Sequence, residues 1–183
     1  MAANLPTPSD IPAVAAFDDA VDAWVRDHRS PVADRVFYGL SSAADHSLLW
    51  NALVALRGAL AGDPALVLRG AAVLGAESAI TNGALKALFR RERPVVDDDP
   101  LPMGMRRPVT SSFPSGHATA AFTAAALLSQ GSRRPGGWYL LATAVSVSRV
   151  YTRMHHASDV VAGAALGIAF GAVARRVLPL RRR

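Results

Sequence analysis

Five apolar stretches in succession constrain this chain more than any other feature. They cover approximately residues 46–62, 65–89, 116–131, 137–154 and 158–178. A helix needs about 20 apolar residues to cross the hydrocarbon core of a bilayer, and several of these stretches are shorter than that. Soluble chains seldom place five such runs one after another. The set as a whole therefore predicts an all-α integral membrane bundle of about five transmembrane helices.

Small residues indicate how the predicted helices pack against one another. In the last stretch, glycines recur at every fourth position: Gly163, Gly167 and Gly171. The third stretch has a similar face of small residues, Ala118, Ala121 and Ala125. Such faces allow close helix approach within a membrane, either inside one chain or between two, so they predict no oligomeric state. Because Arg57 and Arg69 interrupt the first two stretches, a soluble all-α bundle with an alanine- and glycine-rich core is the alternative.

An amphipathic segment, residues 11–45, precedes the apolar stretches. In its first part, acidic residues lie on one side of the helical wheel. Apolar residues recur at helical spacing on the rest of it: Val14, Phe17, Val21, Trp24 and Val25. Ser30 and Pro31 then resemble an N-cap and a first helical position. The second helix that they open is expected to turn its apolar residues inward: Val32, Val36, Phe37 and Leu40. We expect the pair to lie at the membrane interface or to cover the mouth of a site, with ordinary packing as the alternative.

Charge and composition argue against several classes of protein. The net charge of +6 comes from arginines without aromatic stacking partners, so nucleic-acid binding is not expected. The chain has no cysteine, which rules out disulfides and thiol chemistry. Its first residues lack a basic region followed by an apolar run, so no cleaved signal peptide is predicted. The expected organisation is an amphipathic segment at 1–45, one membrane domain at 46–178 and a basic tail at 179–183.

Three short clusters contain most of the reactive side chains. The first reads K-x6-R-P and comprises Lys86 with Arg93-Pro94. The second reads P-S-G-H and covers Pro114 to His117. The third reads S-R-x5-H-x3-D and comprises Ser148-Arg149 with His155 and Asp159. Together they supply cations, two histidines and a carboxylate, which can bind a phosphate and transfer it through a covalent phosphohistidine. Every position matches the signature of the type 2 phosphatidic acid phosphatase superfamily. The chain resembles that superfamily from about residue 86 to residue 159.

Local geometry supports phosphate chemistry at two of the clusters. Ser115 is a natural N-cap after Pro114, and Gly116 would let the backbone approach a phosphate at the start of a helix. His155 and Asp159 are four residues apart, so they share one face if the helix is continuous. The carboxylate can then orient the imidazole for attack, as in a serine triad.

The resemblance implies a role for each residue. His155 is the nucleophile, His117 is the general acid and base, and Asp159 orients His155. The remaining residues bind the phosphate: Lys86, Arg93, Ser115, Gly116 and Arg149. No metal or other cofactor is implied. The acidic run at 97–99 has oxygen ligands that Mg²⁺ prefers, but carboxylate runs in loops are usually solvated.

The order of the motifs along the chain predicts where the site lies. With five spans, all three clusters fall on one side of the membrane. The other side receives Arg133-Arg134, Arg175-Arg176 and the arginines of the tail. Basic loops favour the cytoplasm, so the active site is predicted on the extracytoplasmic side. Four arginines oppose this assignment because they lie on the active-site side: Arg90, Arg91, Arg106 and Arg107.

The resemblance implies hydrolysis of a lipid phosphate at the membrane. The candidate substrates are polyprenyl diphosphate, phosphatidic acid, phosphatidylglycerol phosphate and a prenyl-linked sugar phosphate. Soluble acid phosphatases and vanadium haloperoxidases share the motifs, but the apolar stretches argue against both. A lipid phosphotransferase and a non-catalytic lipid-phosphate binding or transport protein are the alternatives. His156-Ala157 replaces an aromatic-proline pair of many relatives, and the connection 94–114 is expected to form part of the substrate entrance.

Overall fold

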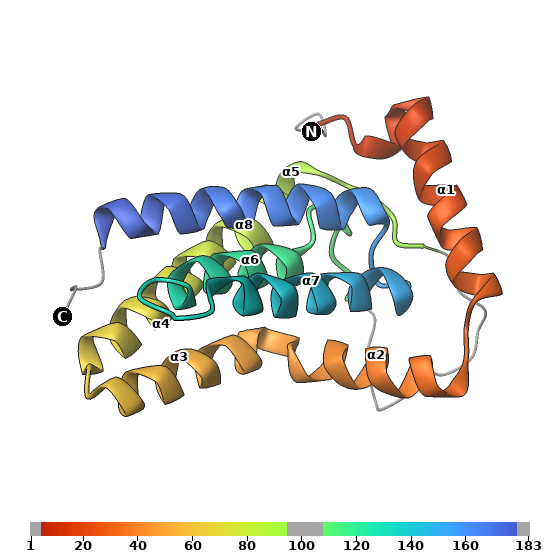
Figure 1. Ribbon diagram of the computed structural model, residues 1–183. Coiled ribbons are helices and arrows are strands. Elements are labelled where there is room, and N and C mark those ends of the chain that lie inside the picture. Colours follow the sequence, from red (N-terminus) through yellow and green to blue (C-terminus); the bar gives the residue numbers. More distant parts are fainter. Residues whose placement is uncertain (1–4, 95–107, 179–183) are drawn as a thin grey trace.

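The computed structural model describes residues 5–94 and 108–178, and all regular structure in these ranges is helical (Figure 1). The α-helices are α1 (Pro12–Asp27), α2 (Pro31–Ala43), α3 (Leu48–Ala61), α4 (Pro64–Ser78), α5 (Lys86–Leu88), α6 (Gly116–Leu128), α7 (Pro135–Tyr151) and α8 (Ala157–Val177). Short 3-10 turns occupy Pro8–Asp10 and Asp45–Ser47, and a π-helix occupies Ala79–Leu85. The all-α prediction is therefore confirmed for the described part of the chain.

Each predicted apolar stretch corresponds to a helix or to one continuous run of helices. The stretch at 65–89 becomes α4, the π-helix and α5, which follow one another without a break over residues 64–88. Among the described helices, α8 is long and apolar enough to cross a membrane by length and composition, whereas α3 and α6 are apolar but shorter. Several helices thus resemble membrane spans in composition more than in length.

Helix α6 forms the centre of the bundle, with α8 and α7 as its main partners and α4 against it as well (Figure 1). Most of its residues are buried, and many of these are alanine or threonine. The predicted glycine face of α8 lies directly on α6. A Cβ on Gly163 would lie 2.5 Å from the Ser115 carbonyl oxygen, and one on Gly167 would collide with the Thr119 carbonyl. The glycines therefore pack helices within this chain, as their spacing allowed.

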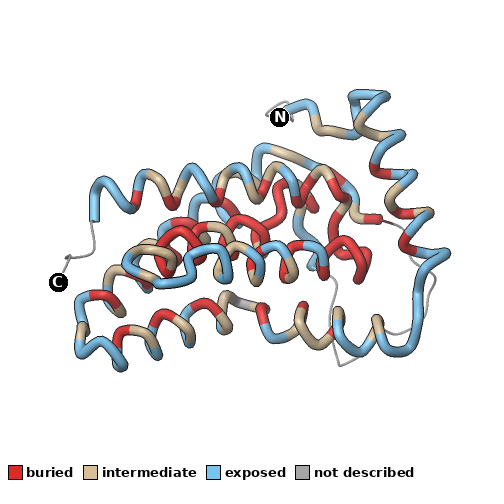
Figure 2. Tube along the Cα trace, in the orientation of Figure 1, coloured by how far each residue is buried: buried red, intermediate tan, exposed pale blue. Residues whose placement is uncertain are grey.

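Many large apolar side chains are exposed on the outside of this bundle, whereas the inward faces of its helices are buried (Figure 2). Leu60 is 81% exposed, Leu68 73% and Leu140 72%. Water would disfavour such a surface, whereas lipid tails accommodate it, and close packing of small residues is how helices associate in a bilayer. The pattern favours the membrane bundle over the soluble alternative.

The N-terminal segment forms two helices as predicted, and the Ser30 Oγ caps the second by accepting from the Ala33 N–H at 3.2 Å. The predicted inward face of α2 is wrong in part, because Val32 and Val36 are 72% and 57% exposed. In α1, the acidic residues Asp18 and Asp22 are buried. The aromatic residues Phe17 and Trp24 are exposed instead. The reason is that the carboxylates of α1 pair with polar groups of the bundle.

Candidate active site

The three sequence clusters meet at one end of the bundle. Lys86 begins α5, Ser115 caps the start of α6, Arg149 lies in the last turn of α7, and Asp159 lies in the first turn of α8. These helix ends lie at the same end of the molecule as α1 (Figure 1). The Ser115 N–H donates to the Asp159 carbonyl at 3.0 Å, which joins the second cluster to the third. The fold thus gathers residues that are 73 positions apart in sequence at most.

His155 lies in the turn between α7 and α8, so it does not share a continuous helix with Asp159. Its Nδ1 is 3.6 Å from the Asp159 Oδ2, which is longer than a hydrogen bond, and its Nε2 is 3.4 Å from an Arg93 nitrogen. Burial, together with the charges of Arg93 and Arg149, lowers the pKa of His155 to about 3 despite the opposing effect of Asp159. The ring is therefore neutral at neutral pH, and one of its two nitrogens carries a lone pair.

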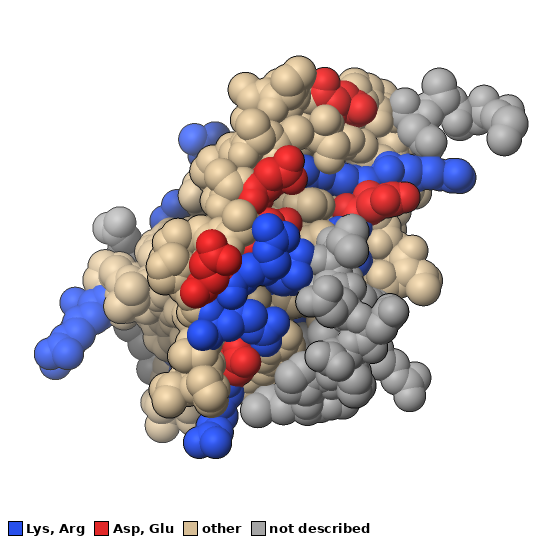
Figure 3. Space-filling view, turned by 90° about the vertical axis from the view of Figure 1, so that its right-hand side faces the viewer, with Lys and Arg blue, Asp and Glu red and all other residues tan. Residues whose placement is uncertain are grey.

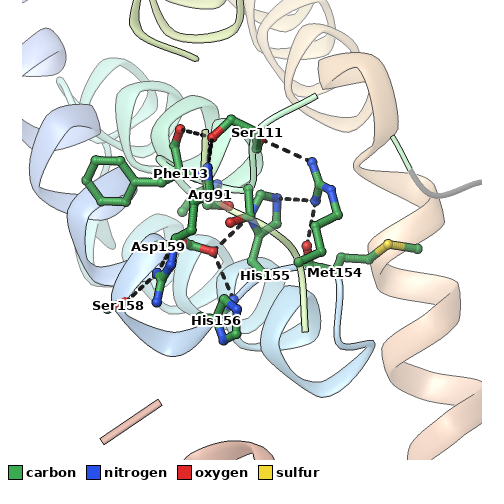
Figure 4. A network of polar contacts seen from close by, with 12 residues as sticks. Arg91, Ser111, Phe113, Met154, His155, His156, Ser158 and Asp159 are labelled. Atoms are coloured by element: carbon green, nitrogen blue, oxygen red, sulfur yellow. Dashed lines mark hydrogen bonds and ion pairs between the residues drawn. The ribbon is translucent and has the colours of Figure 1, made fainter. Parts of the chain in front are cut away.

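Asp159 is held by two groups besides His155. As the third residue of α8, it accepts a hydrogen bond from the His156 N–H at 3.0 Å, in the manner of a helix cap. Its other oxygen, Oδ1, forms an ion pair of 2.5 Å with Arg91 (Figure 4). The side chain is completely buried, so its charge depends on these partners. This arrangement fixes the carboxylate beside the imidazole.

Arg91 is a site residue that the sequence did not single out, because it occupies an undefined position of K-x6-R-P. Besides Asp159, its guanidinium binds Asp18 of α1 at 2.6 Å and the hydroxyl of Ser158 at 2.7 Å. Asp18 in turn accepts from the Ser158 N–H at 2.8 Å. Asp18, Arg91 and the adjacent pair Ser158 and Asp159 come from three segments far apart in sequence. The amphipathic segment therefore reaches the reaction centre through Asp18.

Replacing Asp18 by alanine should lower kcat about a hundredfold and leave KM nearly unchanged. The change leaves Arg91 with one buried carboxylate partner, so we expect Asp159 and His155 to lose their alignment while the cations predicted to bind phosphate stay in place. Steady-state kinetics on a lipid phosphate in detergent would measure both constants. Asp18 is a positioning residue in this interpretation, so Asp18→Glu should recover part of the lost kcat.

Asp27→Asn is the matched control, because Asp27 lies on the same helix and is exposed. Its kinetics should equal those of the native protein. A fall in melting temperature with unchanged kcat in Asp18→Ala would assign Asp18 to packing alone.

His117 faces a carboxylate that the sequence analysis also missed. Its Nε2 lies 2.9 Å from the Oδ1 of Asp45, a residue in the turn between α2 and α3. The same oxygen is 3.7 Å from a terminal nitrogen of Arg149, which also donates to the hydroxyl of Ser41. Asp45 can therefore stabilise a protonated His117 and orient Arg149. No local pattern marks an aspartate for such a role, because only the fold brings it there.

The cations surround the space next to His155. Arg93 donates to the Met154 carbonyl at 2.5 Å and to the Pro108 carbonyl at 3.1 Å, which fixes it over the imidazole. Lys86 interacts electrostatically with Arg93, Arg149 and Asp159. The buried Nε of Arg149 makes no hydrogen bond to any residue that the structure describes, so it is available to a ligand. Lys86 and Arg93 also line an open cavity of about 830 Å³.

Ser115 caps α6 as predicted, since its Oγ accepts from the Ala118 N–H at 3.4 Å. Gly116 has a neighbour that was not foreseen. A Cβ at this position would collide with the amide of Asn82, which comes from the π-helix before Lys86. In this structure the missing side chain of Gly116 thus makes room for Asn82. The wide π turn brings this amide to the start of α6, and π turns often occur at functional sites.

Some predicted features lie outside the described residues: the acidic run at 97–99, Arg106, Arg107 and the basic tail. The described part of the site has a neutral imidazole, a second histidine paired with a carboxylate and several cations within one buried cluster. This set can bind a phosphate dianion, attack it and protonate a leaving group.

Comparisons with known proteins show which family the chain belongs to. Residues 66–183 match the model of the PAP2 superfamily. The chain is 33% identical over 146 residues to the decaprenylphosphoryl-5-phosphoribose phosphatase of Mycobacterium tuberculosis, a match that covers 74% of this chain and 75% of that protein. It is 39% identical over 127 residues to the phosphatase of the same name from Mycolicibacterium smegmatis, covering 68% of this chain and 67% of the other.

The fold has a close counterpart among solved structures. A transmembrane PAP2-type phosphatidylglycerolphosphate phosphatase from Bacillus subtilis superposes with a TM-score of 0.74 at 25% identity, covering 90% of this chain and 86% of that one. The family match includes all three sequence clusters. Its extent and the similarity to the curated relatives show that this chain belongs to the PAP2 superfamily and is a PAP2-type lipid phosphatase.

Proposed function

We propose that this phosphatase removes the phosphate from a prenyl-linked sugar phosphate, without a metal, through a phosphohistidine on His155. Among the four candidate substrates, this class is favoured because the two mycobacterial relatives that match most of this chain are decaprenylphosphoryl-5-phosphoribose phosphatases. The observation that supports the covalent route is the neutral, buried His155 with its Nε2 3.4 Å from Arg93. A phosphoryl group bound by Arg93 would lie next to the attacking nitrogen.

In the first step, the lone pair of the His155 Nε2 attacks phosphorus, and the bond between phosphorus and the ester oxygen breaks. His117, protonated, gives its proton to the departing alkoxide. Lys86, Arg93 and Arg149 stabilise the charge on the phosphoryl oxygens in the transition state. Asp159 stabilises the positive charge that develops on the His155 ring.

In the second step, a water molecule attacks the phosphohistidine. The now neutral His117 takes a proton from this water, the bond between phosphorus and nitrogen breaks, and phosphate leaves. Both histidines return to their starting states. Asp45 supports this cycle because its carboxylate faces His117 and stabilises its protonated form.

The membrane arrangement that we propose has five spans: α3, the continuous run from α4 to α5, α6, α7 and α8. Residues 46–178 are the phosphatase domain, and α1 and α2 lie at the interface over the active-site end. Arg133-Arg134 follow α6 and Arg175-Arg176 end α8, both at the end of the bundle away from the site. These arginines support a site on the extracytoplasmic side.

A panel of lipid phosphates tests the substrate class. We expect the purified protein in detergent with EDTA to release phosphate fastest from the prenyl-linked sugar phosphate. Polyprenyl diphosphate, phosphatidic acid and phosphatidylglycerol phosphate should be slower. Activity that required added Mg²⁺ would contradict the metal-free mechanism. Transfer of the phosphate to an added acceptor lipid, without free phosphate, would identify a phosphotransferase.

The orientation can be tested by cysteine labelling, because the chain has no cysteine of its own. Thr110→Cys lies at the active-site end, and Gly136→Cys lies at the opposite end, where Gly136 faces open space. In spheroplasts, a membrane-impermeant maleimide should label the first variant at once and the second only after lysis. The reverse pattern would place the active site in the cytoplasm.

A further inference from the structure

A second, smaller cavity lies beside the reaction centre on the side of α1. It measures about 460 Å³, and its polar wall combines both signs of charge: Asp22, Arg26, Glu92, Arg93, Arg153 and His156. Among its described lining residues, Pro94 is the one with an apolar side chain. Figure 3 shows the α1 end of the molecule, where acidic and basic side chains lie side by side. This lining does not suit a prenyl tail, which needs an apolar wall.

Among the described residues, several buried polar atoms in this wall make no hydrogen bond. They are the Oδ1 of Asp22, the Nε of Arg153 and the Nδ1 of His156, which is 3.5 Å from the other Asp22 oxygen. Asp22 and Arg153 are each 7% exposed. Arg153 also has a φ of 53°, a left-handed conformation that residues other than glycine seldom adopt. Unsatisfied buried groups are costly, and together they indicate a polar ligand.

The position of Arg93 connects this cavity to the chemistry. Its guanidinium lies 3.4 Å from the His155 Nε2, and its side chain lines both the small cavity and the larger one. A phosphoryl group held by Arg93 would therefore border both cavities. The part of the substrate that bears the phosphate can lie in the small, polar cavity while the rest leaves through the larger one.

We propose that the small cavity is the subsite for a hydroxylated group that bears the phosphate, either a sugar or a glycerol. Each hydroxyl both donates and accepts, so it can pair with a carboxylate and a guanidinium at once. A second phosphate fits less well, because the three carboxylates of the wall, Asp19, Asp22 and Glu92, offset its three guanidinium groups and leave no net positive charge to hold a dianion. The subsite thus selects phosphate esters of hydroxylated groups over diphosphates. This inference rests on the proposed phosphatase function and specifies its substrate.

The test compares Asp22→Leu with the native protein on two substrates, a prenyl-linked sugar phosphate and a prenyl monophosphate. Leucine removes both oxygens at similar size. The ratio of kcat/KM for the sugar phosphate to that for the monophosphate should fall about tenfold, as expected for one lost hydrogen bond to a charged group. Asp27→Asn, on the exposed side of α1, should keep the native ratio. An unchanged ratio in Asp22→Leu would overturn the subsite.

A measurement on the native protein covers the case in which Asp22→Leu does not fold. Ribose 5-phosphate and glycerol 3-phosphate should inhibit hydrolysis of the monophosphate more strongly than pyrophosphate does, and the better of the two identifies the hydroxylated group. Stronger inhibition by pyrophosphate would overturn the subsite while leaving the phosphatase intact. If the native protein hydrolysed neither lipid substrate, the proposed function would fail, and this inference with it.

Discussion

Replacing His155 by alanine is expected to abolish phosphate release from every lipid substrate, by a factor on the order of 10⁴ or more. The variant loses the atom that would bond to phosphorus. His156 is adjacent in sequence, but its Nδ1 lies against Asp22 of α1. The measurement is phosphate release in detergent with EDTA, for native and variant protein.

The control for this experiment must separate chemistry from folding, because His155 is buried. His28→Ala changes a histidine at the exposed end of α1 and should keep native activity. The melting temperature of His155→Ala shows whether the bundle is intact. Substantial activity in a folded His155→Ala protein would remove this residue as the nucleophile and reopen the question of direct attack by water.

Replacing His117 by alanine should lower turnover of alkyl phosphates about 10² to 10⁴-fold, the usual contribution of a general acid and base. An alkoxide leaves poorly without a proton, so the first step suffers most with these substrates. Nitrophenolate leaves without assistance. With nitrophenyl phosphate, the first step should stay fast while the second, which needs His117 to activate water, becomes slow.

A stoichiometric burst of nitrophenol followed by slow turnover is therefore the expected behaviour of His117→Ala. Acid-labile, base-stable phosphate should accumulate on the protein during the burst, and the double variant with His155→Ala should not accumulate it. Equal losses on alkyl and nitrophenyl esters, without a burst, would contradict the role of His117 as a general acid and would indicate that it serves phosphate binding instead.

Local patterns predicted the helices and the defined motif positions, since these depend on nearby residues. Helical periodicity and capping located the elements, and Ser30 and Ser115 cap helices as their sequence contexts indicated. The way in which His155 and Asp159 approach each other was predicted less well. Their spacing suggested a shared helical face, but α8 begins after His155, and the ring approaches the carboxylate from a turn.

The supporting residues were not predictable because their partners are distant in sequence. Asp18 pairs with Arg91 across 73 positions, and Asp45 meets His117 across 72. In the sequence, Asp18 belongs to a helix face that looks solvated, since buried and exposed carboxylates have the same local pattern. Asn82 was missed for a similar reason, because its contact with Gly116 depends on a π turn that no periodicity revealed.

The link between the N-terminal segment and Arg91 has a practical consequence for work with this protein. The Ser9 hydroxyl accepts a hydrogen bond from the Arg91 Nε at 2.9 Å, so the chain already contacts the candidate active site a few residues after its first described position. An affinity tag or fluorescent fusion made close to Ser9 would disturb this contact with Arg91. Helix α8 ends at the far end of the bundle, so fusions for purification or imaging belong after it.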